Sequence, residues 1–478
     1  MNTRYDAIVI GSGPGGSVTA RALAEAGRRV LVIEEGDWVE PGSVQPYSVA
    51  QMQRQYRNNG LTVALGIPSV AYTEGSCAGG GSEVNSGLYH RPSETLLTRW
   101  RQRWQIEALD PLTLEPVHRR VEQELSVAPW PEATLPPQSD LLRRGAENLG
   151  WSGFDVPRWA RYRTADGAVG VEKQTMTRTY LRAALEAGAE LWTATRVRKL
   201  HVERGAARGV EVQRSGSGGE HIETVAADQI FVCAGAIQTP ALLQRSGIRR
   251  NVGGNLSVHP TVKVVAEFPD QVNQPDDLAT YQVKEFGSWL SFGGSASRQA
   301  LVALALAESW QQFGPAIERW QQQIVYYAAI QSRGRGRVQA LPGFTDPLVT
   351  YALTGGDIAM VRSGLARLIH LTLAAGAFQV YPSVRSSPVV TGPVDVPAAT
   401  RVLGRGTASL MTVHLCGTVP MGEDRDKCGA DSFGRVFGVS NLHVNDASLL
   451  PEAPGINPQG TLMAIAQRNI DHHLEEDQ

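Results

Sequence analysis

The chain has 478 residues, of which 42% are hydrophobic and 19% charged, and its formal net charge is −2. This composition is typical of a globular protein with a large core and roughly two to three domains. A charge so close to zero excludes an electrostatic basis for binding nucleic acid or an anionic membrane, so we expect neither partner.

The four cysteines are widely spaced, without a C-x-x-C pair, at Cys77, Cys233, Cys416 and Cys428. This spacing argues against a disulfide framework and against a zinc site, so no metal is expected. The first predicted strand follows Met1 within a few residues, which leaves no room for a signal peptide. The apolar run at 301–307 is too short to cross a bilayer, so a cytoplasmic enzyme is the default expectation.

Residues 5–36 have the pattern of a strand, a glycine turn, a helix and a second strand. Gly11, Gly13 and Gly16 have the G-x-G-x-x-G spacing, which permits a tight turn, close approach of a pyrophosphate and close helix packing. Glu34 ends the second predicted strand, where an acid binds an adenosine ribose. The pattern predicts a dinucleotide site but does not choose between NAD and FAD. The alternative is a turn that binds nothing.

A second glycine-rich stretch spans residues 75–92. From Gly79 to Ser82 the backbone N–H groups have almost no side chain in the way, so they can lie against a flat cofactor or its phosphates. Asn85 is placed to hydrogen-bond a ring edge. Taken alone, the stretch also fits a flexible surface loop.

The middle of the chain changes character at about residue 261. Before it, a buried strand at 228–234 leads into a small-residue turn and a helix at 235–248, which is again the geometry of a nucleotide crevice. After it, strand-like runs follow one another without alternating helices, which predicts an antiparallel sheet backed by helices. These runs are at 262–268, 300–309, 323–332, 337–341 and 348–354, and a helix is expected at 358–375.

Two polar segments lie in apolar surroundings near the end of the chain, at 413–422 and 443–468. The second is expected to end in a helix with Asn457 at the capping position and Pro458 at the first helical position. A histidine such as His414 would, on its own, more often be a core residue than a catalyst. His259 and His443 are interpreted as structural, and Cys416 as packing.

Together these segments resemble the glucose–methanol–choline (GMC) family of FAD oxidoreductases, in one order over nearly the whole chain. The segments at 5–37, 79–89, 235–248 and 255–260, and the C-terminal VHLCGTVPMG, LHVNDASLLP and GINPQGT, each resemble a family motif. Three departures stand out. Arg249 replaces the last glycine of the second signature, and Val258 replaces the aspartate of NLxDHP. Val84 occupies the position where some members carry a histidine that bonds FAD covalently, so non-covalent FAD is expected.

The resemblance implies an α/β fold, in which a Rossmann-like FAD-binding domain, discontinuous in sequence, joins an α+β antiparallel-sheet substrate domain. The FAD-binding domain is expected at 1–95, 168–258 and 404–478, and the substrate-binding domain at 96–167 and 259–403. The residues expected to bind FAD are Gly11, Gly13, Pro14, Gly15, Gly16, Glu34, Glu35, Gly80, Gly81, Ser82, Asn85, Val197, Ala234, Gly235, Asp446, Ala447, Asn457, Pro458 and Gln459.

The resemblance further implies that His414 and Asn457 face the flavin as the active-site pair. Oxidation of an alcohol removes a hydroxyl proton and a hydride, and the hydride passes to flavin N5. A histidine suits the first task as a base, and an amide can hold the developing alkoxide. We therefore predict FAD-dependent oxidation of a small-molecule alcohol to a carbonyl, with oxygen or another carrier as the electron acceptor. The alternatives are an FAD-containing lyase without redox turnover and a non-catalytic flavin-binding protein.

Overall fold

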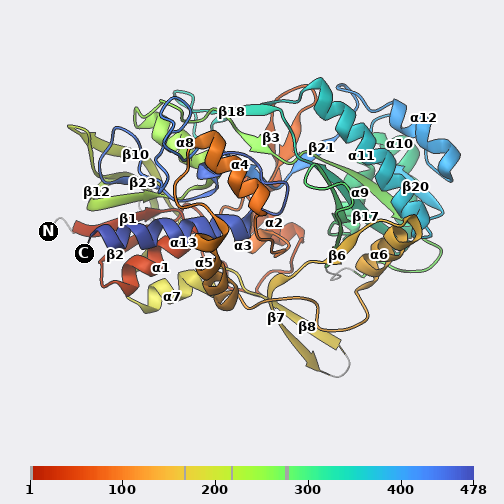
Figure 1. The fold of residues 1–478 in the computed structure, drawn as a ribbon, viewed down its shortest axis with the longest axis horizontal. Coiled ribbons are helices and arrows are strands. Elements are labelled where there is room, and N and C mark those ends of the chain that lie inside the picture. Colours follow the sequence, from red (N-terminus) through yellow and green to blue (C-terminus); the bar gives the residue numbers. More distant parts are fainter. Residues whose placement is uncertain (1–3, 166–167, 217–218, 275–278, 478) are drawn as a thin grey trace.

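The structure is a computed structural model that describes residues 4–165, 168–216, 219–274 and 279–477. Figure 1 shows two halves side by side, each built around its own large sheet. One half has parallel strands with helices beside them, and the other has mainly antiparallel strands backed by α11 (Gly355–Ala374). The predicted fold class, a Rossmann-like half joined to an antiparallel-sheet half, is confirmed.

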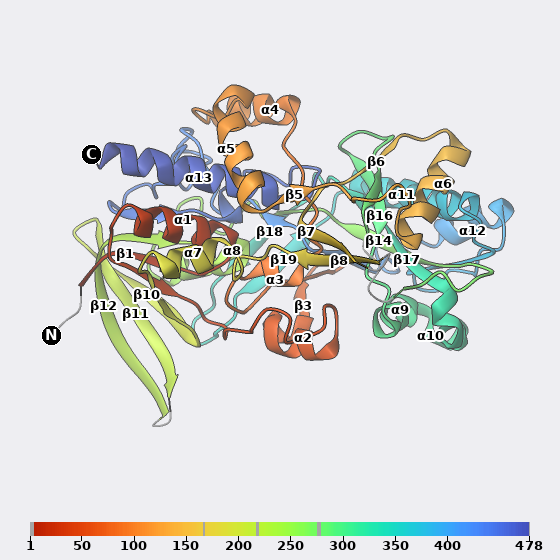
Figure 2. The same cartoon turned by 90° about the horizontal axis from the view of Figure 1, so that it is seen from below.

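The first sheet has seven strands in the order β10-β11-β12-β1-β2-β9, with β23 paired to β12. Strands β23, β12, β1, β2 and β9 run parallel, whereas β10, β11 and β12 form an antiparallel meander that projects from the body in Figure 2. The strands are β1 (Arg4–Ile10), β2 (Val30–Ile33), β9 (Glu190–Trp192), β10 (Thr195–Glu203), β11 (Ala206–Gly216), β12 (Gly219–Val232) and β23 (Leu442–Val444).

The centre of this sheet forms because its strands are apolar on both faces. Every residue of β2 is buried, as are the last four of β1. Helix α1 (Pro14–Glu25) packs on α7 (Tyr180–Glu186) and α13 (Gln459–Glu476), and Figure 1 shows them along one side of β1 and β2. Each fully buried Val, Leu or Ile stabilises the fold by about 1.5–3 kcal/mol, so these strands hold the glycine turn after β1 firmly.

The second sheet has nine strands in the order β3-β4-β21-β14-β17-β16-β15-β6, with β20 paired to β14. Its core is apolar and is covered by α6 and α11. The strands are β3 (Thr62–Ala64), β4 (Val70–Tyr72), β6 (Gly153–Asp155), β14 (Thr261–Glu267), β15 (Tyr281–Val283), β16 (Leu290–Gly294), β17 (Gln323–Ile330), β20 (Gln379–Pro382) and β21 (Leu410–Thr412).

The remaining helices and strands pack around these two sheets. The helices are α2 (Val49–Gln55), α3 (Gly81–Val84), α4 (Glu94–Trp104), α5 (Pro111–Glu124), α6 (Pro137–Leu149), α8 (Gly235–Arg245), α9 (Gln299–Leu306), α10 (Trp310–Phe313) and α12 (Val396–Arg401). The strands are β5 (Val127–Ala128), β7 (Arg158–Ala165), β8 (Ala168–Lys173), β13 (Ser257–Val258), β18 (Arg335–Gln339), β19 (Leu348–Ala352) and β22 (Leu415–Cys416).

Two sequence expectations differ from the structure. Residues 300–309 were expected as a strand, but the segment contains α9, whose Val302 and Leu306 pack on Val265 of β14. Alanine and leucine have high helix propensity, and the period of so short an apolar run does not distinguish a strand from a buried helix. In addition, β3, β4 and β21 pair with the second sheet, although the predicted division assigns them to the FAD-binding domain. The division into two domains itself stays a prediction.

Candidate active site

The turn between β1 and α1 presents uncovered backbone N–H groups. Helix α1 begins at Pro14 with Gly13 as its N-cap, and neither a side-chain cap nor an acid in the first turn occupies its N-terminus. A Cβ on Gly16 would lie 1.9 Å from the Gly11 carbonyl oxygen, and one on Gly15 2.0 Å from the Asn445 carbonyl oxygen. A Cβ on Gly13 would meet nothing within 4 Å. Gly13 therefore faces open space at a helix N-terminus, where a phosphate is stabilised.

The second glycine-rich stretch lies directly against this turn. A Cβ on Gly80 would lie 2.8 Å from Gly13 Cα, and the Gly79 N–H donates to Ser12 Oγ at 3.1 Å. Ser82 Oγ donates to the Gly79 carbonyl at 2.7 Å, which closes the loop on itself, and Gly81 faces open space. Two segments that are distant in sequence thus form one glycine-lined surface.

Lys173 holds the end of this stretch in place through hydrogen bonds, and the sequence analysis did not identify it. Its ammonium group donates to the carbonyl oxygens of Glu83 at 2.9 Å and Asn85 at 2.8 Å. Burial lowers the pKa of Lys173 to about 8. The position of Asn85 is therefore set by a buried lysine at the end of β8. This lysine lies in no sequence motif, so the sequence alone does not identify it.

Glu34 and Glu35 stand at the end of β2, where the sequence predicts adenosine binding. Glu34 accepts hydrogen bonds from the Ser12 N–H at 3.0 Å and the Gly36 N–H at 2.9 Å, and burial raises its pKa. Glu35 instead pairs with Arg57 at 3.1 Å and with Arg196. Glu34 is thus held beside the glycine turn, whereas the charge of Glu35 is matched by arginines.

The start of α8 completes the glycine-lined surface. Gly235 faces open space, and its N–H donates to Asp446 Oδ2 at 2.8 Å. Asp446 also accepts from the Ser448 N–H at 2.8 Å, and Ala234 and Ala447 are the chain neighbours of these anchored residues. Val197 lies on β10 with its side chain buried in the core of the first sheet.

His414 and Asn457, which are distant in sequence, meet at the junction of the two halves. His414 follows β21 and Asn457 precedes α13, and His414 Nε2 lies 3.3 Å from Asn457 Nδ2. Gln459, the first residue of α13, accepts at Oε1 a hydrogen bond from Asn85 Nδ2 at 2.7 Å, so the second glycine-rich stretch reaches the segment next to Asn457. The structure therefore brings together the two predicted catalytic residues and two further residues predicted to contact the flavin, Asn85 and Gln459.

The start of the last helix differs from the expectation. Helix α13 begins at Gln459 with Pro458 in the N-cap position, and no side chain caps it. Asn457 was expected as the cap, but its amide contacts His414 and accepts from Gln282 Nε2 at 3.3 Å instead. The cap interaction is absent because the side chain turns toward the opposite sheet.

His259 lies directly behind His414. Their Nδ1 atoms are 2.8 Å apart, and His259 Nε2 accepts a hydrogen bond from the Gly455 N–H at 2.8 Å. Burial, and to a lesser extent the Lys284 charge, lowers the pKa of His414 to about 4, so this ring is neutral at pH 7. Sequence reasoning interpreted His259 as structural and did not foresee this contact.

The second sheet adds polar side chains to the same place. Gln282 on β15 donates to Asn457 Oδ1 and, at 3.0 Å, to the hydroxyl of Tyr327 on β17. Lys284 Nζ donates to the Gly455 carbonyl at 3.1 Å. No sequence signal marked these residues, because they lie on or directly after ordinary strands outside every motif.

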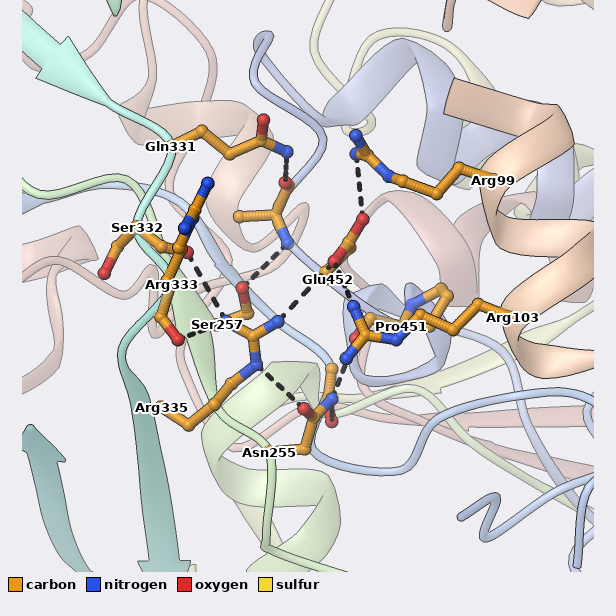
Figure 3. A network of polar contacts seen from close by, with 12 residues as sticks. Arg99, Arg103, Asn255, Ser257, Gln331, Ser332, Arg333, Arg335, Pro451 and Glu452 are labelled. Atoms are coloured by element: carbon orange, nitrogen blue, oxygen red, sulfur yellow. Dashed lines mark hydrogen bonds and ion pairs between the residues drawn. The ribbon is translucent and has the colours of Figure 1, made fainter. Parts of the chain in front are cut away.

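The loop between Asp446 and Asn457 is held by a network centred on Glu452 (Figure 3). The Glu452 carboxylate pairs with Arg99 at 2.8 Å and Arg335 at 3.5 Å, and these arginines come from opposite sides of the loop. Ser257 Oγ accepts from the Ala453 N–H at 2.9 Å, and Gln331 donates to the Ala453 carbonyl at 3.0 Å. The loop that carries Gly455 and Asn457 is therefore fixed by both halves of the molecule.

The four cysteines form no disulfide in the part of the chain that the structure describes. Cys77, Cys233, Cys416 and Cys428 are free and buried. Within residues 4–165, 168–216, 219–274 and 279–477 no group of His, Cys, Asp and Glu side chains is arranged to hold a metal. None of the helices in those ranges combines the length and the apolar character that crossing a membrane requires.

Comparisons with known proteins identify the family. The N-terminal family model of GMC oxidoreductases matches residues 52–261, the C-terminal model matches residues 331–466, and a model of an NAD(P)-binding Rossmann-like domain matches residues 9–40. The chain is 39% identical to an uncharacterized GMC-type oxidoreductase of Sinorhizobium fredii, over 98% of this chain and 94% of that protein.

Two further likenesses are more distant. A long-chain-alcohol oxidase of Arabidopsis thaliana is 24% identical over 98% of this chain and 67% of that protein. The crystal structure of pyridoxine 4-oxidase from Mesorbium loti superimposes with a TM-score of 0.74, at 20% identity over 98% of this chain and 99% of that one. The structural likeness shows the same fold.

Proposed function

Because the chain belongs to the GMC oxidoreductase family, we propose that it oxidises an alcohol to a carbonyl compound, with FAD as a non-covalently bound cofactor. The observation that carries the proposal is the 3.3 Å contact between His414 and Asn457, on a loop bonded to Asn85. The oxidase names of two likenesses support an alcohol as substrate and oxygen as electron acceptor.

The residues present fit FAD. Gly13, Gly81 and Gly235 face open space, and the N-terminus of α1 lacks any side-chain acceptor that would compete with a pyrophosphate. Bound there, FAD would supply the hydride acceptor. Val84 is an apolar, buried side chain that cannot form a histidyl bond to a flavin, which supports non-covalent binding.

His414 is proposed as the general base and Asn457 as the partner of the substrate oxygen. Because the pKa of His414 is about 4, its ring is neutral and can accept the hydroxyl proton at Nε2. Asn457 has no useful pKa, so its amide can only exchange hydrogen bonds with the alcohol and the developing alkoxide.

The hydrogens on the two histidines matter for this role. The Gly455 N–H requires His259 Nε2 to accept, which places the hydrogen of neutral His259 on Nδ1, facing His414. A base at His414 Nε2 needs the opposite arrangement, with the shared hydrogen on His414 Nδ1. That arrangement gives Asn457 Nδ2 its acceptor at His414 Nε2 but leaves the Gly455 N–H without one, so one of these two donors is unsatisfied in either arrangement.

The test is anaerobic. The purified holoenzyme is mixed under nitrogen with a panel of primary and secondary alcohols, and flavin absorbance is followed. Bleaching by an alcohol supports oxidation, whereas an alcohol-binding protein whose flavin stays oxidised would be a lyase or a non-catalytic flavin protein. Acid precipitation of the same sample should release all yellow colour into the supernatant. Colour retained in the pellet would contradict non-covalent binding.

A further inference from the structure

A lysine beside the proposed active-site pair has no acidic partner. Lys284 is half-buried, and in the part of the chain that the structure describes its ammonium group forms one hydrogen bond, to the Gly455 carbonyl, and no ion pair. The adjacent Glu285 is exposed and accepts from the Ser152 N–H instead. A cation shielded from water is costly unless it is paired, so this position calls for an anion.

The charge of Lys284 reaches the active-site histidines. It lowers the pKa of His414, after burial, and contributes in the same direction at His90 and His259. Among the described residues no carboxylate adjoins these three rings through a hydrogen bond or ion pair that would offset the lysine. The surroundings of His414 are therefore positive on balance.

A buried histidine and a glutamine lie near Lys284. His90 is 8% exposed, and its ring faces the Gln282 side chain, whose hydrogen bond raises the pKa of His90 against the effect of burial. Gln282 Nε2 reaches Asn457 and Tyr327, so the Gln282 amide leaves one ring nitrogen of His90 without a hydrogen-bond partner among the described residues. Because almost all buried polar groups in native proteins are satisfied, this nitrogen needs a partner, and a bound ligand supplies one.

The cluster lies against the flavin side of the site. A Cβ on Gly460, in the first turn of α13, would lie 2.5 Å from the His90 carbonyl oxygen, so residue 90 packs beside the loop that carries Asn457. Gln282 is bonded directly to Asn457. A substrate whose hydroxyl meets His414 and Asn457 would thus extend toward Lys284 and His90.

We propose that Lys284, with His90, Gln282 and Tyr327, forms an anion subsite for a carboxylate of the substrate, so that the substrate class is a hydroxy acid. The inference rests on the proposed alcohol oxidation and adds the second group of the alcohol. Lys284, Tyr327 and the single N–H of the neutral His90 ring are donors, which suits the oxygens of a carboxylate. An unsubstituted long-chain alcohol would leave the Lys284 cation without an anion.

The experiment compares matched pairs of substrates in anaerobic stopped-flow reduction of the holoenzyme flavin. Each pair has the same carbon chain, with and without a terminal carboxylate, such as 4-hydroxybutyrate against 1-butanol and 4-(hydroxymethyl)benzoate against 4-methylbenzyl alcohol. The carboxylate should raise kcat/KM by roughly 10–100-fold in at least one pair, the effect of one charge-assisted hydrogen bond.

The variant Lys284→Gln keeps a donor for the Gly455 carbonyl and removes only the charge. The preference for the hydroxy acid, measured as the ratio of the two kcat/KM values within each pair, should disappear in this variant, mainly through the KM of the hydroxy acid. Lys284→Arg should retain part of the preference. Lys199→Gln, an exposed lysine on β10, is the matched control and should leave the preference unchanged.

The outcomes separate this inference from the proposed function. If neutral alcohols reduce the flavin of the parent and the carboxylate gives no advantage, the subsite is wrong and alcohol oxidation stands. An unchanged preference in Lys284→Gln also overturns it. If no alcohol of either kind reduces the flavin, the proposed alcohol oxidation is wrong. The anion subsite is then tested by substrate binding alone. A carboxylate-dependent change in the flavin spectrum that Lys284→Gln abolishes would support it, and no such change would overturn it.

Discussion

Around the predicted FAD site the chain presents mainly backbone, whereas around His414 it presents single side chains from several strands. Gly13, Gly81 and Gly235 face open space, and their neighbours pack so closely that a Cβ on Gly15 or Gly16 would collide with backbone. On the substrate side, Gln282 and Lys284 come from β15 and its end, and His90 comes from the loop before α4. The first surface forms because its glycines have no side chains. The second depends on the polar and charged groups of particular side chains.

Because of this difference, the glycine-lined surface indicates the cofactor, whereas the side chains around His414 bear on the substrate. A glycine-lined surface at a helix N-terminus fits any dinucleotide pyrophosphate, so it identifies the class of cofactor. Side chains such as Lys284 and Gln282 can be exchanged without disturbing the sheets that carry them, so we expect substrate preference to depend on residues of this kind. The chain is an oxidoreductase of the GMC family. We expect the side chains around His414, and not the glycine-lined surface, to identify its substrate.

The largest effect is expected at the chemical step. His414→Ala should slow anaerobic flavin reduction by a good alcohol about 10²–10⁴-fold, as for a lost general base. The flavin spectrum and the FAD content should survive, because the His414 side chain makes its hydrogen-bond contacts with His259 and Asn457 and none with the described residues of the glycine-lined surface. His201→Ala, on β10, is the control. Reduction at the parent rate in His414→Ala would exclude this base.

Asn457→Ala tests the other member of the pair. Loss of one hydrogen-bond donor to an alkoxide should slow flavin reduction about 10²–10³-fold at most. Because Asn457 does not cap α13 in the structure, the affinity for FAD should change little. Fluorescence titration of the apoprotein with FAD measures this. A large loss of FAD affinity would restore the capping role that the sequence suggested.

The sequence-based expectations succeeded where one local motif determines the geometry. The strand, turn and helix at 5–36 need only the glycine spacing and apolar strands, and both are visible locally. They failed at 300–309, because an apolar run packed on β14 reads as a strand or as a helix. His259, Gln282 and Lys284 could not be found, because only the folded sheets bring them to His414.

A smaller effect is expected on the cofactor side. Glu34→Ala should weaken FAD binding by roughly 10–100-fold, the effect of losing a charged hydrogen bond, and the protein should purify partly free of flavin. The Ser12 and Gly36 N–H groups would lose their acceptor in the same variant. Glu40→Ala, an exposed acid further along the chain, is the control. Full FAD occupancy in Glu34→Ala would contradict the assignment of the ribose site.

The smallest effect is expected from pH on the chemical step, although pH should matter for stability. Because the pKa of His414 is about 4, its ring is already neutral at pH 5.5, so flavin reduction by a neutral alcohol should change less than about twofold between roughly pH 5.5 and 7.5.

The stability of the fold should depend on pH more than the reaction does. Burial lowers the pKa of His443 and His90 to about 3. Between about pH 6.5 and these values each of these histidines binds a proton in the unfolded chain but not in the folded one, so its contribution to the free energy of unfolding falls as the pH falls. Glu74, whose pKa burial raises to about 7, contributes in the opposite direction, and we expect the histidines to outweigh it. Stopped-flow reduction and melting temperatures over the same pH series check both statements. A reduction rate that rises tenfold toward pH 7.5 would mean that the base titrates near neutrality, and a melting temperature that rises as the pH falls from 6.5 to 4.5 would mean that the histidines are not the dominant groups.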